Sequence, residues 1–131
     1  MRLVLIIGIL LGLGACSNET EVVVGNKTTM EVEPVVYEAG DVIKGEMVTA
    51  KFTLTNTGEY PLVLGDVKGS CSCTVADYPD EPIAPGESGV VEARVNTDQL
   101  GVGPLNKAVR IVANTEPSVT QVVIHASVLR K

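Results

Sequence analysis

The sequence predicts an all-β fold, a two-sheet antiparallel β-sandwich of about seven short strands. Three observations predict it. Apolar and polar residues alternate with a period of two, which is the spacing of a half-buried strand. Clusters rich in Gly, Pro and Asn separate the alternating segments and are typical of turns. No segment shows the long apolar stripe with capping residues that is typical of a helix.

Residues 1–15 are predicted to be an export signal that is cleaved and takes no part in the fold. Arg2 gives a short positive segment, and an uncharged apolar run follows from Leu3 to Leu13, interrupted by Gly8 and Gly12. The run is too short to span a bilayer comfortably as a helix, but it suits the apolar segment of a signal peptide.

The tetrad Leu13-Gly14-Ala15-Cys16 resembles the lipobox of bacterial lipoproteins, with an apolar residue three places before the cysteine and small residues between. The resemblance implies that Cys16 becomes the first mature residue and carries a diacylglycerol on its thiol and an acyl chain on its amine. Several acyl chains anchor a protein stably, whereas a single chain does not. The residue after the cysteine is Ser17 and not Asp, which resembles the sorting signals of enterobacterial lipoproteins and implies delivery to the outer membrane. The alternative is an ordinary secretory signal with a cysteine just inside the mature chain.

Residues 16–28 are predicted to be the lipidated N-terminus and a polar, acidic tether, and residues 29–131 one folded domain. The clearest strand of that domain is 48–54, and the turn 56–59 ends it. A second extended run covers 61–67. Later strands repeat the alternation, with apolar positions at Val91, Ala93, Val95, Val109, Ile111, Ala113, Val122, Ile124, Ala126 and Val128.

Turns are predicted at 84–87, 101–104 and 114–117. About seven strands separated in this way favour an immunoglobulin-like sandwich, and a small closed barrel is the alternative. The inter-sheet disulfide and the buried Trp of antibody domains are both missing from the sequence.

Five motifs then carry a family likeness. In order they are Phe52-Thr53-Leu54-Thr55-Asn56-Thr57-Gly58, Pro61-Leu62-Val63-Leu64, Ser70-Cys71-Ser72-Cys73-Thr74, Ile83-Ala84-Pro85-Gly86-Glu87-Ser88-Gly89 and Asn114. Together they resemble an uncharacterised lipoprotein family of Bacteroidetes-like bacteria with a Cys-Gly-Cys-Thr signature, which in turn resembles the sandwiches of hydin and major sperm protein. Ser72 stands where that family has Gly. The resemblance implies a fold and a location, and no activity.

Charge and composition exclude several classes of partner. Without Arg2 the chain carries nine basic and 16 acidic side chains, a net charge of −7, which nucleic acid repels. The chain has no Trp and few other aromatic residues, which argues against a groove that stacks sugars or bases. We therefore expect no nucleic-acid partner and no small-molecule substrate.

Cys71 and Cys73 are the two sulfurs left if Cys16 is lipidated. An even count in an oxidising exported compartment favours a disulfide, although a spacing of two requires a bulge or turn before the sulfurs can meet. A Cu(I) or Zn site is a second interpretation, since thiolates are soft ligands, but two ligands do not complete the four of zinc. A redox-active dithiol is the third, without the Cys-x-x-Cys spacing of thioredoxin-like proteins.

Other polar residues form no predicted active site. His125 is expected on an outward strand face with no nucleophile beside it in sequence. Asp77, Asp80 and Glu81 form either a calcium site or, as we expect, a solvated loop. The segment 101–103 lacks the third glycine and the helix of a phosphate-binding loop, and is interpreted as a turn.

The predicted function is that of a non-catalytic binding or assembly module for other envelope proteins. It is anchored to the membrane through Cys16, at the outer membrane on its periplasmic or surface face, with no cofactor besides the lipid. The alternative is a Cu(I), Zn or thiol-redox handling protein that uses the Cys71 and Cys73 pair.

Overall fold

The computed structural model describes residues 25–131, which form eight β-strands. Their bounds are β1 Met30–Glu33, β2 Val36–Ile43, β3 Met47–Asn56, β4 Leu64–Gly69, β5 Thr74–Asp77, β6 Ser88–Asn96, β7 Gly103–Ala113 and β8 Val119–Leu129. The sequence had predicted about seven.

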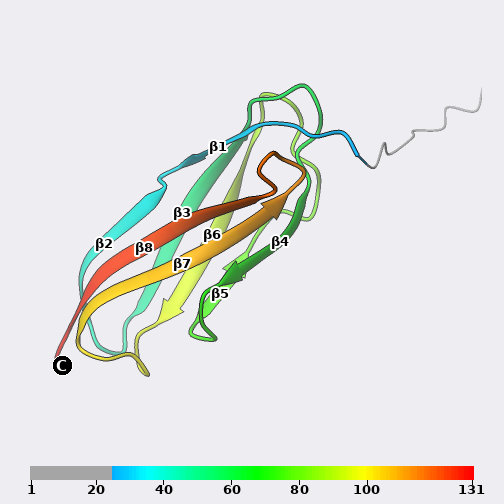
Figure 1. Ribbon diagram of the computed structural model, residues 1–131. Coiled ribbons are helices and arrows are strands. Elements are labelled where there is room, and N and C mark those ends of the chain that lie inside the picture. The colour runs from blue at the N-terminus through cyan, green and yellow to red at the C-terminus, as the bar shows by residue number, and fades with distance from the viewer. Residues whose placement is uncertain (1–24) are drawn as a thin grey trace, which may run out of the picture.

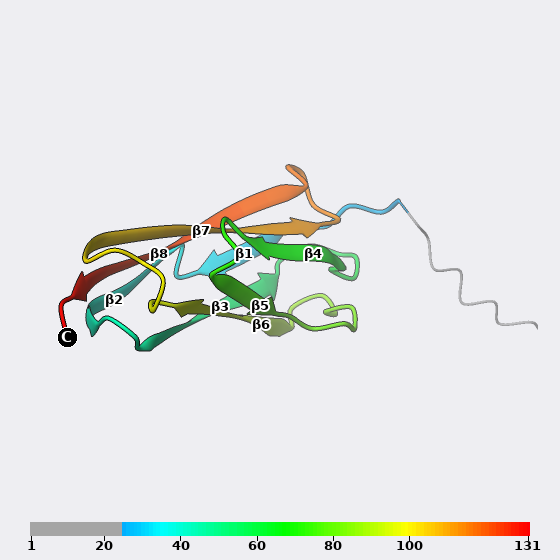
Figure 2. The same ribbon diagram turned by 90° about the horizontal axis from the view of Figure 1, so that it is seen from below.

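The strands form two sheets of four, in the orders β1-β3-β6-β5 and β2-β8-β7-β4. Figure 2 shows them edge-on as two layers, with β7 and β8 in one and β3 and β6 in the other. The all-β sandwich that the sequence predicts is confirmed, with eight strands in place of about seven.

The alternation of apolar residues fixes which face of each strand is buried. In β3 every second residue from Val48 to Asn56 is buried, and the residues between them are exposed or half-buried. Phe52, at the centre of this strand, is fully buried and meets the ring of Tyr37 from the other sheet edge-on, with ring centroids 6.3 Å apart. The two sheets therefore share one apolar core between their inner faces.

One strand pair departs from the predicted antiparallel arrangement. The strands β2 and β8 run parallel, while the other five pairs are antiparallel. The reason is that β1 and β2 follow each other in the same direction along the sandwich, and the chain changes sheet between them at Pro34 and Val35. β2 therefore reaches the second sheet running in the direction of β8.

The structure also differs from the extended run predicted for residues 61–67. Regular pairing begins only at Leu64, where β4 starts. Leu62 lies before it, fully buried, and forms an isolated bridge with Ile83 in which each backbone N–H donates to the other residue's carbonyl at 2.8 Å. Leu62, Ile83 and Ala113 form a small second apolar cluster at this end.

We name the two ends of the sandwich after a fully buried polar side chain at each, Asn56 and Thr97. The chain enters the domain at the Asn56 end, and the C-terminus lies at the Thr97 end (Figure 1). The Thr97 hydroxyl accepts from the Gly45 N–H at 2.9 Å and donates to the Glu46 carbonyl at 2.6 Å. It thereby joins the turn between β2 and β3 to the loop after β6.

The amide of Asn56 organises the other end. Its nitrogen donates to the carbonyls of Tyr60 and Ile83 at 2.7 and 2.9 Å. Its oxygen accepts from the Thr28 hydroxyl at 2.7 Å and from the Gly58 N–H at 3.1 Å. Each donor and acceptor of this buried amide therefore has a partner, as burial in an apolar interior requires.

We expect Asn56→Ala to lower the free energy of unfolding by about 3 kcal/mol, because several buried polar groups lose their partner at once. Urea unfolding beside the parent protein measures the change. Thr53→Ala, on the exposed face of the same strand, is the control and should stay within about 0.5 kcal/mol. A loss below about 1 kcal/mol for Asn56→Ala would contradict the role assigned to the amide.

Candidate functional site

Of the predicted site residues, Cys16 lies outside the described residues, so the structure says nothing about it. Cys71 and Cys73 lie in the turn between β4 and β5 and form a disulfide with their Cα atoms 5.2 Å apart. This separation is within the usual range for a bridge. The turn that the sequence required for the bridge is therefore present.

The disulfide turn, residues 70–73, carries the chain from one sheet to the other. On the β7 side, the Ser70 N–H donates to the Ala108 carbonyl at 2.9 Å, and the Ser70 hydroxyl accepts from the Ala108 N–H at 3.3 Å. On the β6 side, the Asn96 N–H donates to the Cys73 carbonyl at 2.9 Å. Hydrogen bonds to both sheets thus hold the turn in addition to the disulfide.

Thr74 places a hydroxyl beside both sulfurs. Its Oγ1 lies 3.6 Å from the Sγ of Cys71 and 3.8 Å from the Sγ of Cys73, and the residue is 8% exposed. Gly69 makes room for it, because a Cβ at Gly69 would overlap the Thr74 side chain. Gly69, Thr74 and the two cysteines are therefore in mutual contact, whereas the sequence predicted a site role for the cysteines alone.

The disulfide is open to solvent on one side. Ser72 is exposed, and Cys71 and Cys73 are half-buried. A hollow of about 150 Å³ beside the turn is lined by Ser72, Cys73, Asn96 and Gln99. Within residues 25–131 no three His, Cys, Asp or Glu side chains come together as a metal-binding group. A metal ion at this turn would have only the two thiolates as protein ligands from that set.

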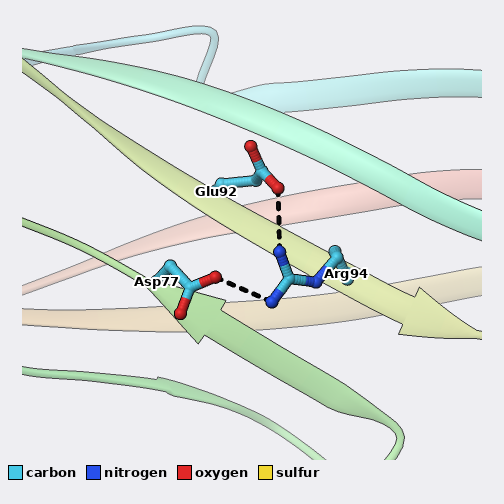
Figure 3. Close-up of polar contacts among 3 residues, drawn as sticks. All are labelled: Asp77, Glu92 and Arg94. Atoms are coloured by element: carbon cyan, nitrogen blue, oxygen red, sulfur yellow. Dashed lines mark hydrogen bonds and ion pairs between the residues drawn. The ribbon is translucent and has the colours of Figure 1, made fainter.

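Of the predicted acidic residues, Asp77 lies at the end of β5, and Asp80 and Glu81 follow it in the loop before β6. Asp77 accepts from Arg94 at 2.7 Å, and Arg94 also donates to Glu92 at 2.9 Å, so that the guanidinium lies between two carboxylates across β5 and β6 (Figure 3). The hydrogen bond and charge of Asp77, with a smaller contribution from Glu92, raise the pKa of Arg94. Asp77 is exposed and Arg94 and Glu92 are half-buried on the outer face of the sheet, so solvent weakens the interaction.

His125 lies on the outward face of β8, as the alternation predicted. Its Nδ1 is 3.1 Å from a carboxylate oxygen of Glu38 on the neighbouring β2. The sequence did not predict this partner, because the two residues are far apart along the chain. The segment 101–103 leads directly into β7 and is followed by no helix, which agrees with its interpretation as a turn.

The point where the chain enters the domain is held by several contacts that the sequence did not predict. The Thr28 N–H donates to the Asn114 carbonyl at 2.9 Å, and Lys27 forms a close ion pair with Glu116. The hydrogen bond and charge of Lys27 hold the pKa of the Glu116 carboxyl below its ordinary value. A Cβ at Gly58 would overlap Thr28, so the Asn56-Thr57-Gly58 motif also serves this contact.

Residues 30–128, nearly the whole described domain, match the family described as Protein of unknown function (DUF1573). The chain belongs to this family. That the chain belongs to an uncharacterised family, as the sequence motifs predicted, is thereby confirmed, whereas the lipoprotein character and the Cys-Gly-Cys-Thr signature of that family stay predictions. No curated protein matches the chain.

Solved structures similar to this DUF1573 chain show how widely its fold is used. A protein of unknown function from Porphyromonas gingivalis is 20% identical, with a TM-score of 0.70 over 84% of this chain and 51% of that one. The PapD-like domain 7 of human CEP192 is 9% identical, with a TM-score of 0.64 over 80% and 88%. The periplasmic chaperone SfaE is 9% identical, with a TM-score of 0.52 over 79% and 57%.

At these identities the likeness concerns the fold alone. The DUF1573 chain spans about half the length of the Porphyromonas protein. It spans about a fifth of VesC, a secreted serine protease of Vibrio cholerae that is 19% identical with a TM-score of 0.55 over 70% of this chain. Among residues 25–131 we find no helical segment able to cross a bilayer.

We expect the double variant Cys71→Ser, Cys73→Ser to fold and to lose about 2 kcal/mol of unfolding free energy. The bridge closes a loop of only three residues, so it constrains the unfolded chain little. Urea unfolding measures the loss, and Ser72→Ala in the same turn is the control that keeps the bridge. Failure of the double variant to fold would show that the disulfide supports the whole domain.

Proposed function

We propose that this protein is a lipid-anchored lipoprotein of the bacterial cell envelope whose sandwich binds another envelope protein without catalysis. The observation that carries the proposal is the way the chain joins the sandwich. Thr28 is buried and bonded to Asn56 and Asn114, and Lys27 pairs with Glu116. An anchor attached through Cys16 would therefore hold the Asn56 end toward the membrane and present the opposite end.

The Thr97 end carries four of the large apolar side chains that are exposed in the described residues, and a protein partner bound there would cover them. Ile43 and Leu129 are neighbours across β2 and β8 and are 38% and 39% exposed. Met47 and Val102 at the same end are 55% and 52% exposed. Exposed apolar side chains that gather on one surface favour protein binding.

A hollow of about 380 Å³ adds shape to this end. Val102, Pro104 and Lys107 are among its lining residues. The hollow is wide and shallow, which suits a side chain or loop of a protein better than a small molecule enclosed on all sides. We assign the Thr97 end to a protein of the same envelope, because that is what an anchored domain meets.

Sandwiches of this kind occur in exported proteins, such as the periplasmic chaperone SfaE and the secreted protease VesC, and also in human CEP192, so the fold alone does not assign a location. The envelope location, preferably the outer membrane, is carried by the lipobox resemblance and Ser17, as in the sequence prediction. A Cu(I), Zn or thiol-redox handling protein that uses Cys71 and Cys73 stays the alternative prediction.

We expect Cys16→Ser to abolish membrane association, because the thiol that receives the lipid is removed. Fractionation of cells that express the full chain tests this, with mass spectrometry of the N-terminus of the parent. The parent should begin at Cys16 and carry acyl mass, and Ser17→Ala should remain in the membrane. An unmodified parent N-terminus would overturn the anchor.

For the partner, we expect a photo-crosslinking amino acid at Met47 to capture one recurrent protein in intact cells. The same group at Thr53, exposed on the sheet face away from that end, should not capture it. Val102→Asp should reduce the Met47 product, because a charge in an apolar contact is costly. Equal products from both positions, or no effect of Val102→Asp, would contradict binding at the Thr97 end.

A further inference from the structure

We infer that Cys71 and Cys73 form a reversible dithiol–disulfide couple that exchanges with the thiols of another protein, with Thr74 as its positioning residue. The couple adds an activity to the proposed binding function, and it needs neither the lipid anchor nor the apolar surface at the Thr97 end. Three observations carry it: the anchoring of the turn, the place of the Thr74 hydroxyl and the access to the sulfurs.

The anchoring allows the bridge to open without loss of the fold. Ser70 is bonded to Ala108 on β7, Cys73 is bonded to Asn96 on β6, and the Thr74 N–H donates to the Cys71 carbonyl at 3.2 Å. None of these hydrogen bonds uses a sulfur atom. After reduction they would still hold the two cysteines at their present spacing, so the thiols stay close enough to close again.

The Thr74 hydroxyl supplies the interaction that a reacting thiol needs. Thr74 is almost fully buried, and the two sulfurs are the only side-chain hydrogen-bond partners found for its Oγ1 in the described domain. A hydroxyl can donate to a thiolate, and a hydrogen bond to the charged form favours that form. The thiolate is the species that attacks and leaves in disulfide exchange. Thr74 can serve whichever sulfur is released.

Access is provided by the open side of the turn. Ser72 is exposed and both cysteines are half-buried, so a thiol of another protein can reach the bridge. The hollow beside Cys73 is bordered by Asn96 and Gln99, which are neutral and polar. A buried structural bridge would show neither feature.

Exchange with a partner dithiol takes two steps. A thiolate of the partner attacks one sulfur of the bridge, which breaks the bond between Cys71 and Cys73, forms a mixed disulfide and releases the other cysteine as a thiolate. A second partner thiolate then attacks the partner's sulfur in the mixed disulfide, which forms the partner's own disulfide, breaks the mixed bond and releases the remaining cysteine of this protein as a thiolate. The partner dithiol is oxidised to a disulfide with the loss of two electrons and two protons, and Cys71 and Cys73 are reduced to a dithiol.

The first test is equilibration of the full-length protein, extracted in detergent, with mixtures of reduced and oxidised glutathione. Trapping of free thiols gives the molar equilibrium constant for closing the bridge. We expect it to be at least tenfold larger than for the peptide Gly-Ser-Cys-Ser-Cys-Thr, because the protein holds the thiols together. Circular dichroism should stay that of a β-sandwich throughout. Equal constants for protein and peptide, or unfolding on reduction, would overturn the couple.

The second test concerns Thr74. Thr74→Val keeps the volume beside Gly69 and removes the hydroxyl, and we expect the reduced protein to react with iodoacetamide at least threefold more slowly at neutral pH. Thr74→Ser should restore the rate, which a purely structural role of the side chain would not predict. Thr49→Val, on the exposed face of β3, is the matched control and should react like the parent. Parent-like reactivity of Thr74→Val would remove the assigned role.

Discussion

The buried amide of Asn56 is the constraint on which much of this structure depends. One side chain binds the incoming chain at Thr28, the turn at Gly58 and Tyr60, and the loop at Ile83. An amide buried without partners would cost on the order of several kcal/mol, so these segments can take up few other arrangements. The amide of Asn56 therefore contributes to fixing the point where the chain enters the domain, together with the contacts of Asn114 and Glu116.

Asn114, directly after β7, also joins several backbone segments through its side-chain amide. Its side chain donates to the carbonyls of Asn26 and Pro61 at 3.0 and 2.9 Å and accepts from the Val63 N–H at 2.7 Å. Asparagine suits such places because its side chain offers a donor and an acceptor that mimic the backbone. The two amides together hold the residues before β1 and the segment between β3 and β4, where the chain has no regular strand pairing.

Local pattern was enough to predict the strands that cross the core. The alternation from Val48 to Leu54 determines which face is buried, because a shift by one residue would expose every apolar side chain of the strand. It did not predict that β2 joins the second sheet in parallel to β8, since that depends on where the chain changes sheet at Pro34. Nor did it separate Leu62 from β4, because a bridge to Ile83 is a long-range pairing that alternation does not encode.

At the disulfide turn, too, the sequence predicted the local requirement but not the contacts between distant segments. Spacing alone showed that Cys71 and Cys73 require a bend in order to meet, whereas the roles of Gly69 and Thr74 depend on how two sheets approach one another. Because the bridge closes only three residues and the turn is bonded separately to β6 and β7, its oxidation state is weakly coupled to the core. A change at these sulfurs would therefore alter the surface near the Thr97 end and leave the Asn56 end unaffected. With the proposed anchor and the inferred dithiol–disulfide couple, a sandwich of this design would combine an attachment at one end with reactive chemistry toward the other.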